Sequence, residues 1–134
     1  MRKLSMLKDT VELYLYIGEF DDEAQFQKVI IKNCYCITSK GANSTARGKA
    51  PSDSVKFYIF DSKSVVVSEY GTPLQYVPYE EWKYAVDKSK KWTLSDKGED
   101  YFSIVGNDNR YKIASFSRKK TGRKRMWHFE VIGR

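Results

Sequence analysis

Residues 11–17 read VELYLYI, an alternation that puts Val11, Leu13, Leu15 and Ile17 on one side of the chain. Successive side chains of a strand point to opposite faces, so this period of two predicts a β-strand with one buried face. Tyr, Val, Ile and Phe dominate the patterned segments of the whole sequence, and these residue types favour strands. The segment and its repetition therefore predict a mainly β fold.

A second, longer strand is expected at residues 26–37, after an acidic, turn-like link at residues 18–23. Its alternation groups apolar side chains on both sides of the strand. Those expected on one side are Val29, Ile31, Tyr35 and Ile37, and those on the other are Ile30, Cys34 and Cys36.

Five further segments show the strand pattern, and one shows the pattern of a helix. The additional strands are predicted at residues 55–60, 65–67, 101–105, 111–116 and 126–132. Residues 78–86 predict a helix of about two turns, with Tyr79, Trp82 and Val86 at spacings of three and four. We therefore expect one domain over residues 1–134, a small antiparallel β-barrel or sandwich of six to seven strands with one short helix and long loops.

Charge is concentrated in one place along the chain. Lys and Arg number 24 against 17 Asp and Glu, which gives a net charge of +7. Six of the basic residues lie in residues 118–125, and without them the net charge is +1. They are Arg118, Lys119, Lys120, Arg123, Lys124 and Arg125. Because two predicted strands flank this segment, we expect a hairpin with a basic tip; residues 39–54, small and polar, are expected to form a flexible loop.

The reactive side chains do not form the pattern of an active site. Cys34 and Cys36 are separated by one residue and, with His128, offer too few ligands for zinc, so we expect two reduced thiols, no metal and no cofactor. His128 is the only histidine and lies in a predicted strand, where an exposed or interface side chain is expected. No apolar run approaches the ~20 residues of a membrane span. These features predict a soluble, non-enzymatic protein with no catalytic residues.

The basic segment has two interpretations. Six cations on a hairpin tip could contact phosphates, while strand tyrosines and phenylalanines stack on bases as on an OB-type surface. Alternatively, the charged tip keeps the hairpin soluble or docks on an acidic protein surface. Charge alone does not specify the partner.

Four groups of residues between about Thr10 and Arg134 carry a resemblance to a known family. They read DTVELY (9–14) with IIKNCY (30–35), PYEEWK (78–83), WTLSDKGEDY (92–101) with IVG (104–106), and YKI (111–113) with MWHFEVIG (126–133). In these groups the sequence resembles small proteins encoded among the head and neck genes of tailed phages and prophages of Gram-positive bacteria. One departure is at residues 97–100, KGED, where that family usually has a Pro-Gly-Asp turn.

The resemblance implies a structural role at the head–tail junction, similar to head-closure or connector proteins. Its implied partners are portal or adaptor proteins, tail-completion proteins, further copies in a ring within the virion, and packaged DNA, with no membrane. The implied location is the virion neck, or the host cytoplasm before assembly. The alternative function is an OB-like β-barrel module that binds nucleic acid through the basic hairpin at residues 118–125.

Overall fold

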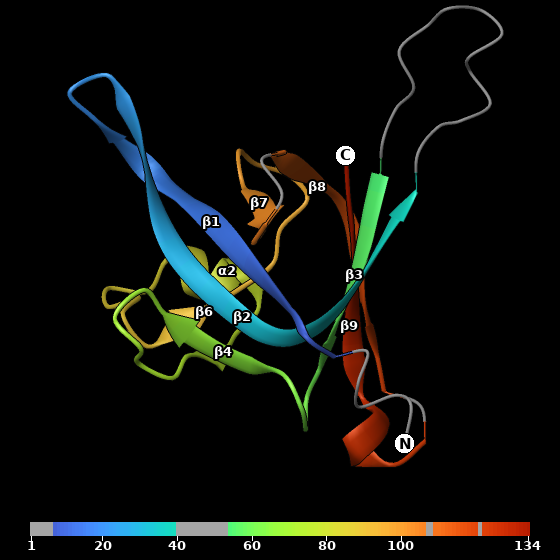
Figure 1. Cartoon of the computed structure of the whole chain (residues 1–134). Coiled ribbons are helices and arrows are strands. Elements are labelled where there is room, and N and C mark those ends of the chain that lie inside the picture. The colour runs from blue at the N-terminus through green and yellow to red at the C-terminus, as the bar shows by residue number, and fades with distance from the viewer. Residues whose placement is uncertain (1–6, 40–53, 107–108, 121) are drawn as a thin grey trace, which may run out of the picture.

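The computed structural model describes residues 7–39, 54–106, 109–120 and 122–134, and these are mainly β-strands (Figure 1). In chain order the elements are β1 (Asp9–Phe20), β2 (Glu23–Ser39), β3 (Ser54–Phe60), β4 (Val65–Ser68), β5 (Gln75–Tyr76), α2 (Tyr79–Lys83), β6 (Lys91–Trp92), β7 (Tyr101–Ile104), β8 (Tyr111–Lys119), the 3-10 helix η2 (Lys124–Met126) and β9 (His128–Gly133). Seven strands form one sheet, and β5 pairs with β6 separately. The predicted fold class is confirmed. The loop expected at residues 39–54 falls on residues 40–53, outside the described ranges.

The main sheet closes on itself. Hydrogen-bonded neighbours follow the order β1-β7-β8-β9-β3-β2, and β2 also pairs with β1, which completes a ring of antiparallel strands. β4 lies outside this ring, paired with the middle of β2. Closure pairs the edges that an open sheet would leave exposed, and the result is barrel-like.

Alternate side chains fill the interior of the ring. Val11, Leu13 and Leu15 of β1 are fully buried, as the alternation of residues 11–17 predicts. Across the interior, Phe57 of β3 meets Phe102 of β7 edge to face, with their ring centroids 4.8 Å apart. Truncation of such a side chain to alanine costs about 2–5 kcal/mol of stability. The barrel is therefore a packed core rather than a channel.

The hairpin of β1 and β2 extends beyond the ring (Figure 1). β1 continues to Phe20 and β2 begins at Glu23, so only Asp21 and Asp22 form the turn. Both have positive φ angles, 54° and 64°, which are typical of the two-residue turn that matches the twist of a hairpin. The link predicted at residues 18–23 is therefore too long, because both strands continue into it.

Ile17 does not share the burial of the residues that it alternates with. Its side chain is 50% exposed, although the pattern places it with the buried face. The register against β2 shifts between Tyr16 and Gly18, and the hairpin leaves the body of the barrel there. Ile17 therefore keeps the alternation of β1 but has no core opposite its side chain.

β2 changes face at Asn33, which has a φ of 62°. The register against β1 shifts here, so that the fully buried residue after Ile31 is Cys34. Tyr35 and Ile37 consequently leave the side that Ile31 occupies, and Ile37 is 39% exposed. The predicted grouping of side chains is wrong beyond residue 33, because a bulge inserts one extra residue into the alternation.

The helix is shorter than residues 78–86, since α2 comprises five residues. Trp82 is buried, and its indole Nε1 donates a hydrogen bond of 3.0 Å to Oε1 of Gln27. Lys88 Nζ donates to two backbone carbonyls at the end of the helix and so satisfies groups that a longer helix would bond. Val86 is fully exposed, so its predicted packing with Trp82 is wrong.

Candidate interaction surfaces

The basic segment belongs to the β8–β9 hairpin, but Arg118 and Lys119 lie in β8 itself, which continues past the predicted end at residue 116. β8 and β9 are antiparallel neighbours, with Arg118 opposite Phe129 and Lys119 opposite His128. β9 begins at His128 rather than at Met126, because the preceding three residues form η2. Figure 1 shows η2 projecting at one end of the molecule. We call residues 118–125 the basic hairpin; Thr121 lies outside the described residues.

Arg118 is anchored to the barrel rather than free. Its Nη1 lies 3.0 Å from Oδ1 of Asp61, its Nη2 bonds the second carboxylate oxygen, and its guanidinium lies 4.2 Å from the ring centroid of Phe129. A planar guanidinium suits this paired contact with a carboxylate. Arg118 therefore joins β8 to the turn after β3, and its charge is largely matched within the chain.

Two lysines of the basic hairpin lie over the indole ring of Trp127. The Nζ atoms of Lys120 and Lys124 lie 5.2 Å and 5.9 Å from its ring centroid, close enough for cation–π attraction. Arg123 and Arg125 are exposed and extend from the surface. The structure thus divides the six predicted cations: Arg118 is paired, two lysines lie against an indole, and the others point into solvent or toward the outer face of β9.

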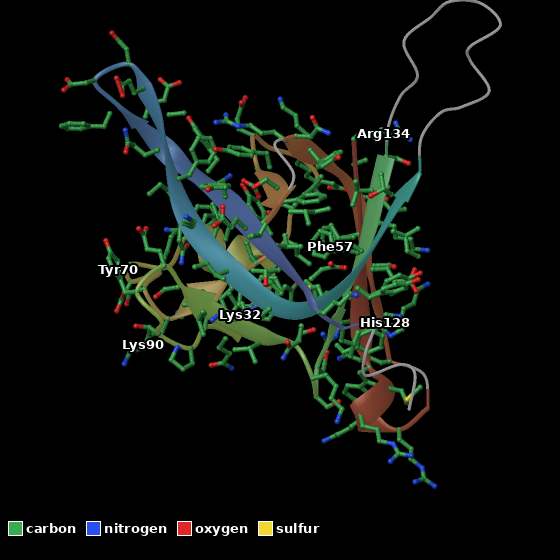
Figure 2. All side chains as sticks on the ribbon, viewed as in Figure 1. Lys32, Phe57, Tyr70, Lys90, His128 and Arg134 are labelled. Atoms are coloured by element: carbon green, nitrogen blue, oxygen red, sulfur yellow. The ribbon has the colours of Figure 1, made fainter. Side chains whose placement is uncertain are left out.

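A cluster of rings lies on the outer face of β2, β3 and β9, next to the basic hairpin. Tyr58 is its centre, with ring centroids of Tyr35 at 5.8 Å, Phe60 at 6.3 Å and His128 at 5.6 Å. Lys56 Nζ lies 5.3 Å from the Tyr58 ring. Figure 2 shows His128 on the opposite side of the β3–β9 pair from Phe57, which points into the barrel. We call these four rings the outer aromatic cluster.

His128 is held by two acceptors. Its Nδ1 lies 3.0 Å from the carbonyl oxygen of Met126 and its Nε2 lies 3.1 Å from Oε2 of Glu130. A neutral imidazole has one N–H, so only the doubly protonated ring donates to both oxygens at once. His128 holds the pKa of Glu130 below its usual value, and Lys56, 3.4 Å from Oε1, acts in the same direction. The His128 side chain, predicted to be exposed or at an interface, is 18% exposed and contacts residues of its own chain.

A half-open cleft lies near the β5–β6 pair, where β3 and β8 end and β9 begins. Its volume is about 250 Å³. Polar and apolar atoms share its walls about equally, and Arg118 and Asp61 contribute charged groups. The lining residues are Ile59, Phe60, Asp61, Ser64, Val66, Leu74, Tyr76, Trp92, Arg118 and Phe129.

The opposite end of the molecule carries the opposite charge. The end of the β1–β2 hairpin carries Glu19, Asp21, Asp22 and Glu23, all exposed, and Phe20 between them is 70% exposed. No ion pair links these carboxylates to a cation in the described part of the chain. We call residues 19–23 the acidic tip. It lies at the upper left of Figure 1, and η2 at the lower right.

The two cysteine thiols lie where burial disfavours the thiolate form. Burial raises the pKa of Cys36 to about 12, and that of Cys34 is raised further, so both thiols stay protonated at neutral pH. Over the described ranges, His, Cys, Asp and Glu side chains do not gather into a group of three or more that could hold a metal ion. No described helix is long and apolar enough to span a bilayer.

Sequence patterns identified the basic residues but not their surroundings. The alternation of residues 55–60 does place Tyr58 and Phe60 on one face, and this signal could have revealed part of the outer aromatic cluster. The Arg118–Asp61 pair joins residues 57 apart in sequence, and the cleft joins residues between Ile59 and Phe129; no local pattern encodes either. The acidic link was found, but Phe20 was not singled out within it.

Comparison with known proteins gives one result for the chain as a whole. No curated protein and no solved structure matches it. Residues 6–134 match a family described as a family of unknown function, DUF6751. This match spans nearly the whole length, so the chain belongs to the DUF6751 family.

Proposed function

We propose that this protein is a non-enzymatic structural component of the phage or prophage neck, a head–tail connector or head-closure protein that acts by assembly with other proteins. The observation that carries the proposal is a closed barrel from which two hairpins of opposite charge project at opposite ends (Figure 1). Such arms present charge and exposed apolar side chains to partners while the core stays rigid. The resemblance of residues 10–134 to neck-gene products supplies the setting.

The proposed partners are portal or adaptor proteins on one side, tail-completion proteins on the other, and further copies of the chain in a ring. The proposed location is the virion neck, or the host cytoplasm before assembly. Packaged DNA is a further contact, for which the exposed cations Arg123 and Arg125 are suited.

Deletion of the gene from an inducible prophage tests this role. We expect induced cells to yield heads without tails, or heads that have lost their DNA, when viewed by electron microscopy. Wild-type protein supplied from a plasmid should restore complete particles. Tailed, DNA-filled particles in normal number from the deletion strain reject the proposal.

A second function is favoured by one specific feature, the outer aromatic cluster beside the basic hairpin. The rings of Tyr35 and Tyr58 stack with their centroids 5.8 Å apart, on a surface flanked by Lys56 and the basic hairpin. Proteins that bind single-stranded nucleic acid combine aromatic rings and cations in this way. Titration with labelled single-stranded DNA and RNA at two salt concentrations distinguishes this function. Micromolar binding that weakens steeply with salt and is lost in Arg123→Gln/Arg125→Gln supports it, and salt-independent or absent binding rejects it.

A further inference from the structure

The acidic tip exposes an aromatic side chain that has no packing role in the barrel. Phe20 is 70% exposed and lies between carboxylates at the end of a tight, two-residue turn. Ile17, 50% exposed, adds apolar surface at the base of the same hairpin. An exposed ring on a projecting, ordered hairpin is available as an anchor residue for a protein contact.

The cleft at the other end of the molecule has the complementary chemistry. Aromatic side chains of Tyr76, Trp92 and Phe129 line it, and Arg118 contributes a guanidinium to its polar side. The turn after β3 links this cleft to the basic hairpin, since Ser62 Oγ donates a hydrogen bond of 3.0 Å to the carbonyl oxygen of Arg125. A cleft with aromatic and charged walls thus opens beside the region of highest positive charge.

The acidic tip cannot reach the cleft of its own chain. In Figure 1 the tip lies at the far end of the β1–β2 hairpin, away from the end of β3 and the start of β9, where the cleft opens. A contact between the two therefore requires two copies.

We propose that the acidic tip of one copy inserts Phe20 into the cleft of a second copy, with its carboxylates facing the basic hairpin. The half-buried side chains of Phe60, Leu74 and Tyr76, which line the cleft, would contact the inserted ring. The four carboxylates of the tip would face Arg123, Lys124 and Arg125 of the basic hairpin, which the Ser62–Arg125 hydrogen bond joins to the turn beside the cleft. The contact joins two different surfaces of the chain, so repetition produces a ring or an open series of copies. It deepens the proposed assembly role, on which it rests for its biological setting, by naming one partner.

Photo-crosslinking of the full chain tests the insertion directly. Phe20 is replaced by p-benzoylphenylalanine, and equal amounts of isotopically labelled and unlabelled protein are mixed and irradiated. We expect mixed-isotope crosslinks from position 20 to peptides that contain Tyr76, Trp92 or Phe129. The matched control places the same group at Tyr84, whose exposure of 73% is close to that of Phe20, and should give no such crosslinks.

Sedimentation of the same protein measures the strength of the contact. Phe20→Ala is expected to weaken self-association at least about tenfold, as for a buried aromatic anchor, while Tyr84→Ala leaves it unchanged. Glu23→Lys and Arg123→Glu should each weaken it, and their combination should restore it. Raising the salt concentration from about 0.05 M to about 0.5 M should weaken the wild-type contact.

A chain that stays monomeric up to about 1 mM and gives no mixed-isotope crosslink to the cleft overturns the inference. The inference is also overturned if crosslinks from position 20 are no more specific for the cleft than those from position 84. These outcomes are distinct from those that test the neck role. If Phe20→Ala fully complements the prophage deletion, the Phe20 contact is rejected as part of assembly and the neck role stands. If the deletion strain makes normal particles, the neck role is rejected even where crosslinks to the cleft are found.

Discussion

Asp100 is predicted to make the stability of the fold depend on pH. The residue is 4% exposed, and its Oδ1 accepts a hydrogen bond of 2.8 Å from the backbone N–H of Tyr16, while Oδ2 has no partner among the described residues. Burial raises the pKa of Asp100 from 3.8 to about 6, against the opposing effect of the Tyr16 N–H. The folded protein therefore binds this proton more tightly than the unfolded chain does.

The sign and size of the effect follow from that difference. Between pH 4 and pH 6 the folded state carries more protons than the unfolded state, so stability falls as pH rises and is lowest once the buried carboxylate is charged. A pKa change from 3.8 to about 6 corresponds to at most about 3 kcal/mol. Because relaxation around the charged carboxylate reduces the effect, we expect Asp100 to contribute about 1–2 kcal/mol to the loss of stability.

Asp100→Asn isolates this contribution, because the amide keeps the acceptor for Tyr16 but cannot ionise. Urea unfolding followed by tryptophan fluorescence, at pH values from about 4.5 to about 7.5, measures the free energy of unfolding of both proteins. The free energy of unfolding of the variant, relative to that of the wild type, should increase by about 1–2 kcal/mol from the low to the high end of this pH range. Asp96→Asn, an exposed position in the same turn, is the control and should leave the pH dependence as it is. Parallel curves for wild type and Asp100→Asn would refute the reasoning.

Three further predictions concern packing, pairing and reactivity. Gly133→Ala should destabilise the fold by about 1–3 kcal/mol in the same urea assay, because the new methyl would lie 2.4 Å from ring atoms of Phe102; an unchanged midpoint contradicts this packing. Arg118→Lys should lose the paired contact with Asp61 and lower the free energy of unfolding by about 0.5–1 kcal/mol. A double-mutant cycle that shows no coupling between these two positions would show that the pair does not stabilise the fold. The Cys36 thiol, with its pKa raised to about 12, should resist disulfide-exchange reagents at neutral pH until urea unfolds the chain, whereas rapid labelling of the native protein would show that it is not buried as described.

Local alternation was sufficient to predict the seven strands of the main sheet and the inner face of β1, but not the two-residue strands β5 and β6. The period of two at Val11, Leu13 and Leu15 reflects a strand whose one face meets a core throughout. The same rule failed for Ile17 and beyond Asn33, because burial depends on whether a core lies opposite and on bulges that shift the alternation. Neither property is encoded by the residue types of the strand itself.

The candidate surfaces were predictable only in part, for a similar reason. Six cations in eight residues identify a basic tip from composition alone. The cleft requires knowledge of how the ring closes, since Trp92 precedes β7 in the chain, whereas Arg118 and Phe129 come from β8 and β9. Phe20 gains its significance from its projection away from the barrel, which depends on the length of the β1–β2 hairpin.

We propose above all that this chain works as an assembled part of a phage particle, through its shape and charged arms. Antibody labelling of purified virions from an induced prophage, viewed by electron microscopy and paired with mass spectrometry of the same particles, tests it most directly. We predict that the chain is present in a constant number of copies per particle, with label between head and tail. Infectious, DNA-filled virions that contain none of it would contradict the claim.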